Sequence, residues 1–229
     1  IRSHILKNME VCKKASQTVI SNRKFVETLG TKKDYSTEEL INFQTDILSN
    51  IDNIKDINTD INRLRVFIDN EFLPEFYPTI YFESHISGEE WFKTVLEMKG
   101  AIYWRVIHLE EVFRNESING NEVVSLYREI EYGNSHVGVI EVNMLSDIFF
   151  GNLYSNAGSE DNLFCIIKNK EYMHWNRNSN FFKNVYIEPD YLKQQITTNV
   201  NETEGSFALN ISNVHLRVTY IYIDALDIY

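Results

Sequence analysis

The pattern of hydrophobic and polar positions predicts a long helix over residues 1–29. Small or apolar side chains recur every three or four residues, which places them on one face of a helix. These residues are Ile1, Ile5, Met9, Cys12, Ser16 and Val19. Gly30 is a stop signal for this helix. We expect the face either to form a seam between two copies of the chain or to pack against the rest of its own chain.

A second helix is predicted to begin near Ser36. Ser36 is a candidate N-cap, and Glu39, three residues later, completes a capping box. The helical spacing of apolar residues then continues at Leu40, Phe43, Ile47, Ile51 and Ile54.

After about residue 60 the pattern is typical of strands. Residues 64–68 (Leu-Arg-Val-Phe-Ile) are predicted to form a strand with polar neighbours, and Pro74 and Pro78 mark a loop rich in aromatic residues. A short helix is predicted at residues 88–98. Strong β-formers and alternation with a period of two predict three further strands, at residues 101–108, 122–131 and 137–142.

A smaller set of elements follows. We expect a helix over residues 144–154, a hairpin of residues 163–168 and 171–175 around Asn169-Lys170, and a helix over residues 189–198. Two strands, residues 206–211 and 215–223, complete the chain. The order is therefore a helical segment and then two modules that each mix helices and strands.

Composition narrows the class of protein. With 229 residues, 43% of them hydrophobic, the chain can bury a substantial core. A net charge of −11 with scattered Lys and Arg argues against a nucleic-acid partner. No apolar run reaches the roughly 18 residues of a membrane span. Because the chain starts at Ile1 within a predicted helix, we interpret it as a fragment, and we expect Cys12 and Cys165 to be buried free thiols.

Signatures of catalysis are missing from the sequence. There is no glycine-rich phosphate loop and no Gly-x-Ser-x-Gly motif. The six histidines are dispersed, and none pairs with a second His or a Cys at the spacing of metal ligands. We therefore expect this chain to be no enzyme and to hold no metal and no cofactor.

Four stretches, taken in order, resemble the double Cache (dCache) sensor domain of bacterial histidine kinases, particularly the YesM-like sensors of Gram-positive bacteria. They are residues 88–93 (Gly-Glu-Glu-Trp-Phe-Lys), 100–104 (Gly-Ala-Ile-Tyr-Trp), 124–130 (Val-Ser-Leu-Tyr-Arg-Glu-Ile) and 138–143 (Gly-Val-Ile-Glu-Val-Asn). Residues 217–226 resemble the family's last strand and the turn before a second membrane helix.

The resemblance implies an α+β fold in which a long N-terminal helix precedes two PAS-like modules, each an antiparallel sheet with flanking helices. Residues 1–58 would be a helical stalk, residues 59–154 a membrane-distal ligand-binding module and residues 155–229 a membrane-proximal module. The domain would lie outside the cytoplasm, joined to the membrane by helices beyond this fragment, and would signal to a cytoplasmic histidine kinase.

Two other interpretations remain open. The same sensor domain can serve another output, such as an AraC-type membrane regulator or a cyclase. Alternatively, the chain is a secreted binding protein or enzyme with no signalling role.

Aromatic and polar residues of the distal module are the candidates for binding a small molecule, because binding sites combine apolar walls with a few aimed polar groups. The candidates are Tyr81, Trp91, Tyr103, Trp104, Tyr127, Arg128 and Asn143. Either Arg105 or Arg128 would hold a polar group of the ligand, and the resemblance favours Arg128. Strand alternation places Trp104 and Arg105 on opposite faces unless a bulge intervenes. The alternative is that Trp91 and Trp104 only pack in the core.

The sequence departs from the dCache domains that bind amino acids. Those domains carry an Arg-x-Trp-Tyr helix and an Asp on the exit strand, whereas residues 89–92 read Glu-Glu-Trp-Phe here and the exit strand ends at Asn143. Without that carboxylate a ligand ammonium loses its charged partner. We therefore expect no conventional amino-acid receptor, and prefer a carbohydrate or another neutral molecule as the ligand.

Overall fold

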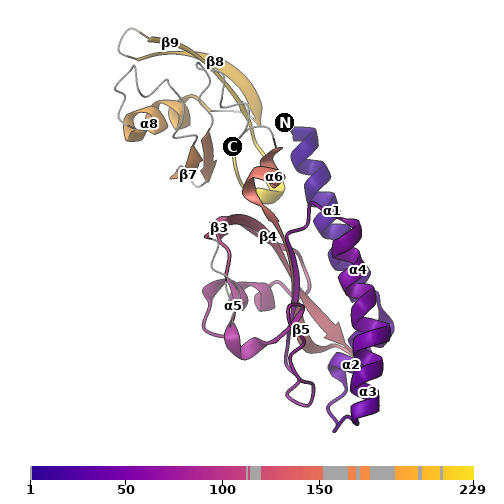
Figure 1. Cartoon of the computed structure of the whole chain (residues 1–229). Coiled ribbons are helices and arrows are strands. Elements are labelled where there is room, and N and C mark those ends of the chain that lie inside the picture. The colour runs from indigo at the N-terminus through magenta and orange to yellow at the C-terminus, as the bar shows by residue number, and fades with distance from the viewer. Residues whose placement is uncertain are drawn as a thin grey trace. The chain divides into compact units, whose positions relative to one another are not determined.

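The chain is organised as two compact units. The computed structural model describes residues 2–111, 113, 120–151, 165–168, 171–175, 189–200, 203–211 and 214–229. The larger unit is Leu6–Phe149, and the smaller unit joins Phe150–Tyr229 with Ile1–Ile5. Helices and strands occur in both, which confirms the expected α+β class (Figure 1).

The N-terminal segment forms two helices, where the sequence predicted one. Helix α1 (Arg2–Ile20) ends before Asn22, and helix α2 (Arg23–Gly30) begins after it. Asn22 has an extended backbone, and its side chain accepts a hydrogen bond from the backbone N of Phe25 at 3.2 Å. It therefore caps a new helix, as Asn does at N-cap positions. The predicted end at Gly30 is confirmed.

The predicted apolar face of α1 is buried within its own chain. Met9, Cys12 and Val19 are almost inaccessible to solvent, and burial raises the pKa of the Cys12 thiol to about 12. Asn8 on the same helix donates hydrogen bonds to the backbone oxygens of Ile148 and Phe149, both at 3.1 Å. This face is therefore not available as an interface with a second copy of the chain.

The second helical segment contains a π-helical turn that the spacing did not predict. Helix α3 (Thr37–Asn42) begins with the predicted Ser36–Glu39 capping box. The π turn η1 (Phe43–Leu48) follows, and α4 (Ser49–Ile57) completes the segment. Because a π turn holds one more residue than an α turn, Leu48 is buried with Phe43, and Ile47 is only half-buried.

A five-stranded sheet forms the core of the larger unit, in the order β2-β1-β5-β4-β3. Pairing is antiparallel except between β1 and β2. The α helices α1 to α4 run along one side of the sheet, and helix α5 (Glu90–Glu97) lies on the other (Figure 1). The strands are β1 (Arg63–Ile68), β2 (Ile80–Phe82), β3 (Tyr103–Leu109), β4 (Glu122–Tyr132) and β5 (Ser135–Leu145).

The sheet face toward the long helices is mostly apolar. Alternate residues of the strands bury large hydrophobic side chains there. They include Leu64, Val66, Ile68, Trp104, Val106, Val124, Leu126, Ile140, Val142 and Met144. This packing is the hydrophobic core, and it fixes which face of each strand turns toward the long helices.

The smaller unit contains two hairpins and one helix in its described part. Strands β6 (Cys165–Lys168) and β7 (Glu171–Trp175) pair as predicted, and helix α8 (Pro189–Asn199) precedes the pair β8 (Glu204–Ile211) and β9 (Val214–Ile221). The backbone of Tyr229, beyond the 3-10 turn η5 (Asp224–Leu226), pairs with that of Ile167.

Helix α6 (Ser146–Phe150) joins the two units in sequence. It begins at Ser146 and not at residue 144, because β5 continues to Leu145, and residues 152–154 of the predicted helix lie outside the described part.

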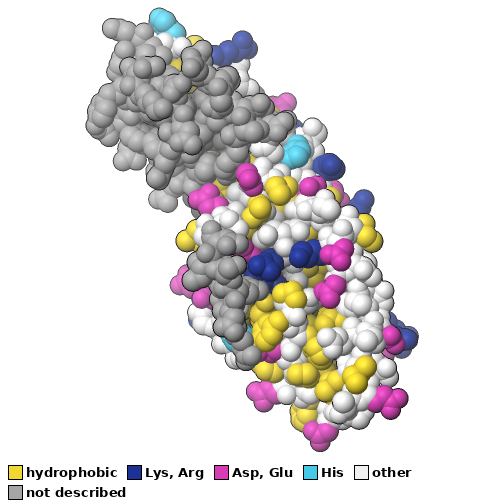
Figure 2. Space-filling view, in the orientation of Figure 1, with side chains coloured by type: hydrophobic (Ala, Val, Ile, Leu, Met, Phe, Trp, Pro, Cys, Tyr) yellow, Lys and Arg dark blue, Asp and Glu magenta, His cyan; other side chains and the backbone are white. Residues whose placement is uncertain are grey.

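The visible surface of the larger unit mixes hydrophobic and charged side chains (Figure 2). Its exposed large hydrophobic residues include Phe72, Tyr77 and Met98. Within the described ranges, no helix combines the length and apolar character needed to cross a membrane.

The contact between β1 and β5 gives a test of the fold. A Cβ added to Gly138 would meet the backbone O of Phe67 at 2.4 Å, and Gly138 pairs with Ile68. We expect Gly138→Ala to lower the free energy of unfolding by about 1–3 kcal/mol, the usual effect of overpacking. Gly88→Ala is the control, because nothing lies within 4 Å of its added Cβ. Chemical denaturation of the two variants measures both effects, and equal stabilities would contradict this register.

Candidate functional site

The sheet face toward α5 carries two rows of polar and aromatic side chains. Cross-strand pairing aligns Arg65, Glu141, Tyr127 and Tyr103 in a first row, on β1, β5, β4 and β3. The same strands align Arg63, Asn143, Ser125 and Arg105 in a second row. We call these eight residues the polar face. Buried sheet faces are normally apolar, so this face is the feature that requires explanation.

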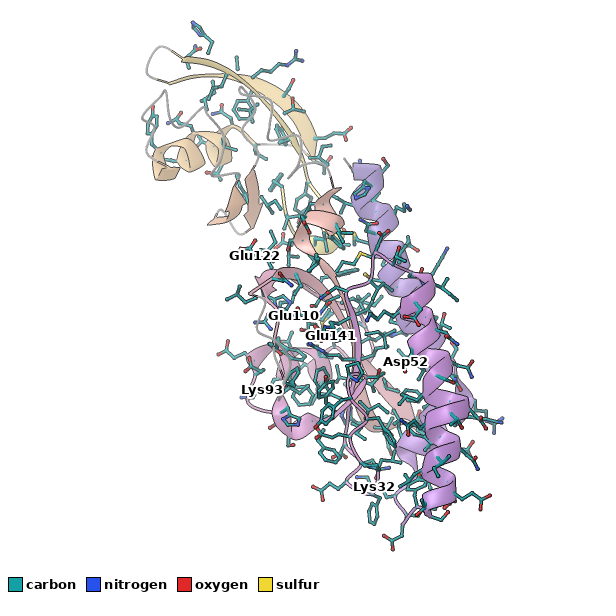
Figure 3. The ribbon with its side chains drawn as sticks, in the orientation of Figure 1. Lys32, Asp52, Lys93, Glu110, Glu122 and Glu141 are labelled. Carbon is teal, nitrogen blue, oxygen red and sulfur yellow. The ribbon has the colours of Figure 1, made fainter. Side chains whose placement is uncertain are left out.

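A buried ion pair lies at the centre of the polar face. Arg65 and Glu141 are direct cross-strand partners, and their side chains are 0% and 4% exposed. The Nη1 of Arg65 lies 3.4 Å from a carboxylate oxygen of Glu141. The same guanidinium lies 3.4 Å from Glu110 and donates to the backbone oxygen of Glu111 at 3.0 Å. Glu110 and Glu141 therefore share one cation. Figure 3 labels the two glutamates in the larger unit.

Hydrogen bonds from the polar face stabilise the Glu141 carboxylate. Its Oε1 accepts from the Tyr127 hydroxyl at 3.1 Å, from the Asn143 amide at 3.1 Å and from the Ser125 hydroxyl at 3.0 Å. Burial would raise the pKa of Glu141, but Arg65 and these neighbours together hold that pKa below its ordinary value. Burial and the nearby carboxylates raise the pKa of Tyr127 well above its ordinary value. Glu141 is therefore charged and Tyr127 neutral.

A β-bulge brings His108 to the same face. The register between β3 and β4 shifts between Arg105 and His108, and Ile107 in between has φ +45°. A β-branched residue rarely adopts positive φ, and bulges of this kind redirect side chains next to functional sites. His108 consequently reaches Ser125, with Nε2 2.9 Å from the hydroxyl oxygen.

The protonation of His108 follows from its surroundings. Burial, together with the charge of Arg105, lowers the pKa of His108 to about 4. The imidazole is then neutral at neutral pH, and its proton sits on Nδ1, which lies 3.0 Å from the backbone oxygen of Leu109. The single proton of Ser125 therefore has two acceptors, His108 and Glu141. This arrangement differs from a catalytic triad, in which the carboxylate contacts the histidine rather than the serine.

Glu111 connects helix α5 to the polar face near its exposed rim. Its carboxylate accepts a hydrogen bond from the indole N–H of Trp91 at 3.1 Å and from Arg105 at 2.5 Å. The Trp91 ring stacks on Tyr127, with centroids 4.0 Å apart. Burial raises the pKa of Glu111 above its ordinary value despite Arg105. Both members of this pair keep about a quarter of their side-chain surface exposed, so solvent reaches them.

An aromatic cluster adjoins the polar face at Arg65. Phe67, Tyr81, Trp91 and Tyr127 are buried in one hydrophobic cluster with residues of α5, and Phe113 packs against it. The guanidinium carbon of Arg65 lies 5.9 Å from the centroid of the Tyr81 ring. Arg65 therefore contacts carboxylates and also lies beside an aromatic ring of the cluster.

A histidine between two carboxylates holds the segment before α5 against the sheet. The two ring nitrogens of His136 on β5 lie 2.6 Å from Glu83 in the 3-10 turn η2 (Glu83–His85) and 2.9 Å from Glu129 on β4. Burial would lower the pKa of His136, but the two glutamates outweigh it and raise that pKa.

The structure brings together five of the seven predicted ligand-binding residues. Tyr81, Trp91, Tyr103, Tyr127 and Asn143 lie on or beside the polar face.

Trp104 and Arg128 lie on the opposite face of the sheet. Trp104 packs 5.9 Å from the ring of Phe149. Arg128 donates to the backbone oxygen of Gly100 at 2.8 Å and to Gln17 of α1 at 2.7 Å. The bulge in β3 lies after Arg105, so Trp104 and Arg105 keep opposite faces. Of the two arginines weighed from the sequence, Arg105 and not Arg128 lies on the polar face.

The sequence analysis missed Arg65, Ser125, His108, Glu111 and Glu141. An arginine in the middle of an otherwise apolar strand was the available signal for Arg65. Glu141 precedes Asn143 by two residues, so the alternation rule already placed it on the same face. This face of the exit strand therefore carries a carboxylate at Glu141, although Asn143 stands where the amino-acid-binding domains have an Asp. Among the described residues no group of three or more His, Cys, Asp or Glu is placed to hold a metal ion.

No protein-family model and no curated protein sequence matches the chain. Sensory domains of a bacterial chemoreceptor are among the solved structures with a similar fold. The sensory domain of the Campylobacter jejuni chemoreceptor Tlp3 (CcmL) with isoleucine bound has a TM-score of 0.51 and 15% sequence identity, covering 98% of this chain and 90% of that one. The Tlp3 ligand-binding domain in complex with L-valine has a TM-score of 0.52 and 14% identity, with coverage of 98% and 90%. The fold of this chain matches that of these sensory domains.

The central ion pair predicts strongly non-additive effects on stability. Arg65→Met leaves the buried Glu141 without its cation, which we expect to cost about 3–5 kcal/mol of unfolding free energy. Glu141→Leu should cost less, because Arg65 keeps Glu110 as a partner at 3.4 Å. The double variant removes both charges and should recover most of that loss, while Glu110 keeps Arg63 as a partner at 3.0 Å. Urea unfolding of the three variants measures the coupling; a double variant as unstable as the sum of the single variants contradicts it.

The His136 contact predicts a pH dependence. Because the folded-state pKa of His136 is raised, its stabilising contribution is complete below the unfolded-state pKa of about 6.5 and disappears as the pH rises through the folded value. We expect the melting temperature of the wild type to fall relative to that of His136→Gln between about pH 6 and 9. Parallel melting curves for the two proteins over that range would contradict this.

Proposed function

We propose that this chain is the extracytoplasmic sensor domain of a membrane-bound histidine kinase and that it binds a small molecule over the polar face. The observation that carries the proposal is the burial of Arg65 and Glu141 on a sheet face whose opposite side is apolar. The fold shared with sensory domains supports the same role.

The energetics of the buried pair argue for function rather than stability. Replacing a buried ion pair by well-packed hydrophobic residues is often neutral or stabilising. A structural core gains little stability from a charged pair, a neutral histidine and a serine hydroxyl grouped in one place. A binding site gains from them, because fixed polar groups orient a ligand and provide specificity.

The charges of the site favour a ligand without net charge. Arg63, Arg65 and Arg105 face Glu110, Glu111 and Glu141, so three positive and three negative charges cancel. An ion of either sign would leave one charge of the site uncompensated. Neutral molecules such as carbohydrates and zwitterions such as amino acids both satisfy this condition. The Tlp3 domains bind isoleucine and L-valine. Amino acids, which the sequence argued against, are therefore included among the ligands to be tested.

Signal transfer would begin at α5. Trp91 on this helix contacts Tyr127 and Glu111 at the same time, so a ligand that inserts beside Glu111 changes how the helix packs on the sheet. A ligand shifts the conformations only by the difference in its affinity for them. The same contacts that select the ligand would therefore produce the signal.

Two arginines on opposite faces of the sheet give a matched test. A thermal-shift screen of amino acids, sugars and other uncharged metabolites identifies a ligand, and calorimetry measures its affinity. We expect Arg105→Gln to weaken that affinity by about 10- to 100-fold, the loss of one charged hydrogen bond. Arg128→Gln should leave it unchanged, because Arg128 contacts Gly100 and Gln17. A ligand sensitive to the second variant and not to the first would refute the site.

The output is tested in the full-length protein. In membrane vesicles the ligand should change the rate of histidine phosphorylation in the cytoplasmic part, and Arg105→Gln should shift the response to higher ligand concentration. Binding to the domain without any phosphorylated histidine in the full-length protein would refute the kinase output.

A further inference from the structure

The ring of Phe113 has well-defined neighbours next to the polar face. Its centroid lies 5.5 Å from that of Phe67, 5.2 Å from that of Tyr81 and 5.8 Å from that of His85. The guanidinium carbon of Arg65 lies over the same ring at 5.3 Å. We call Arg65, Phe67, Tyr81 and His85 the aromatic box.

We propose that the aromatic box is the subsite for a single aromatic ring of the ligand, and that Phe113 and the ligand ring compete for it. The proposal rests on the function proposed above and names the chemical class of the ligand.

The box is built by the fold and not by Phe113. Arg65 and Phe67 belong to β1, Tyr81 to β2 and His85 to the turn η2. The first three are fully buried, and His85 is fixed by Glu75, 2.6 Å from its Nε2. Phe113, in contrast, lies outside the helices and strands and is only partly buried. Moving its ring therefore disturbs no backbone pairing of the sheet.

The geometry of the box favours an aromatic ring over a saturated one. Phe67 meets the Phe113 ring edge-on, at an interplanar angle of 68°, an arrangement stabilised by the quadrupoles of two π systems. The Arg65 cation is attracted to the negative face of a π system. A saturated ring or a sugar presents C–H groups to the guanidinium and gains no such attraction. This chemistry favours an aromatic ligand over the carbohydrate preferred from the sequence.

Arg65 belongs to both the box and the polar face, which limits the size of the ligand. A ring in the box lies beside the guanidinium, whose donors are shared with Glu110, Glu111 and Glu141. A polar substituent close to the ring reaches these groups. The ligand class is therefore a small molecule with one aromatic ring, a short polar substituent and no net charge.

Removing the competing ring tests the proposal. In Phe113→Ala we expect phenol, used as the probe, to bind at least about tenfold more tightly than to the wild type, because the box is vacated. Cyclohexanol, the saturated counterpart of phenol, should gain much less. Titrations followed by NMR measure both affinities. Phe113→Leu, which refills the box with a saturated side chain, should reduce the gain for phenol and serves if the alanine variant folds poorly.

Phe25→Ala is the matched control for cavity formation. Phe25 is fully buried and stacks on Phe43 at 6.1 Å, among the long helices. A cavity there should not distinguish phenol from cyclohexanol by the same ratio. Equal gains for the two probes in Phe113→Ala, or no gain at all, would overturn the aromatic subsite. The Arg105 and Arg128 variants test the proposed binding site separately, so a failure of the aromatic subsite is distinguishable from a failure of the proposed function.

Discussion

The arrangement of the larger unit depends on the pairing of Arg65 with Glu141. The two residues face each other across neighbouring strands, so the register of β1 against β5 determines whether they meet. A shift of two residues would keep the apolar side chains on their own face, but it would place Arg65 opposite Val139 or Asn143 and separate the two buried charges, at a large cost in desolvation. The ion pair therefore selects one register among those that the apolar residues alone allow. Charge pairing supplies specificity here, and hydrophobic burial on the other face supplies the stability.

Local signals in the sequence predicted most elements of the fold. The capping box at Ser36, the stop at Gly30 and the alternating strands are encoded by residues close together in the chain, and the structure contains them. The errors arise where a single residue changes the local geometry. Asn22 begins a new helix instead of continuing the first, and one extra residue in the π turn moves Leu48 into the core in place of Ile47. The hydrophobic period is the same before and after such positions, so periodicity alone does not locate them.

The candidate site was predicted only in part, because its key residues are distant in sequence. Aromatic residues are conspicuous in a sequence, and Trp91, Tyr103 and Tyr127 were candidates for the walls of a pocket because of the likeness to a known family. Arg65 and Glu141 are 76 residues apart, and each alone resembles an ordinary surface charge in a strand. Only the pairing of β1 with β5 shows that both are buried. His108 reaches the polar face only because of the bulge in β3, and the sequence of this strand does not indicate that Ile107 has a positive φ.

The carboxylates on the polar face change the argument about the ligand. In the sequence, Asn143 occupies the position where the dCache domains that bind amino acids carry an Asp. The missing charge argued against a ligand with an ammonium group. In the structure, Glu141 lies two residues before Asn143 on the same face, but its charge is already balanced by Arg65 and three hydrogen-bond donors. Glu111 is different, because it is partly exposed and its pKa is raised. A carboxylate that is poorly stabilised by its own protein gains most from a new donor. Glu111 is therefore the group on this face best suited to receive a donor from the ligand, and its bond to Trp91 connects that event to helix α5.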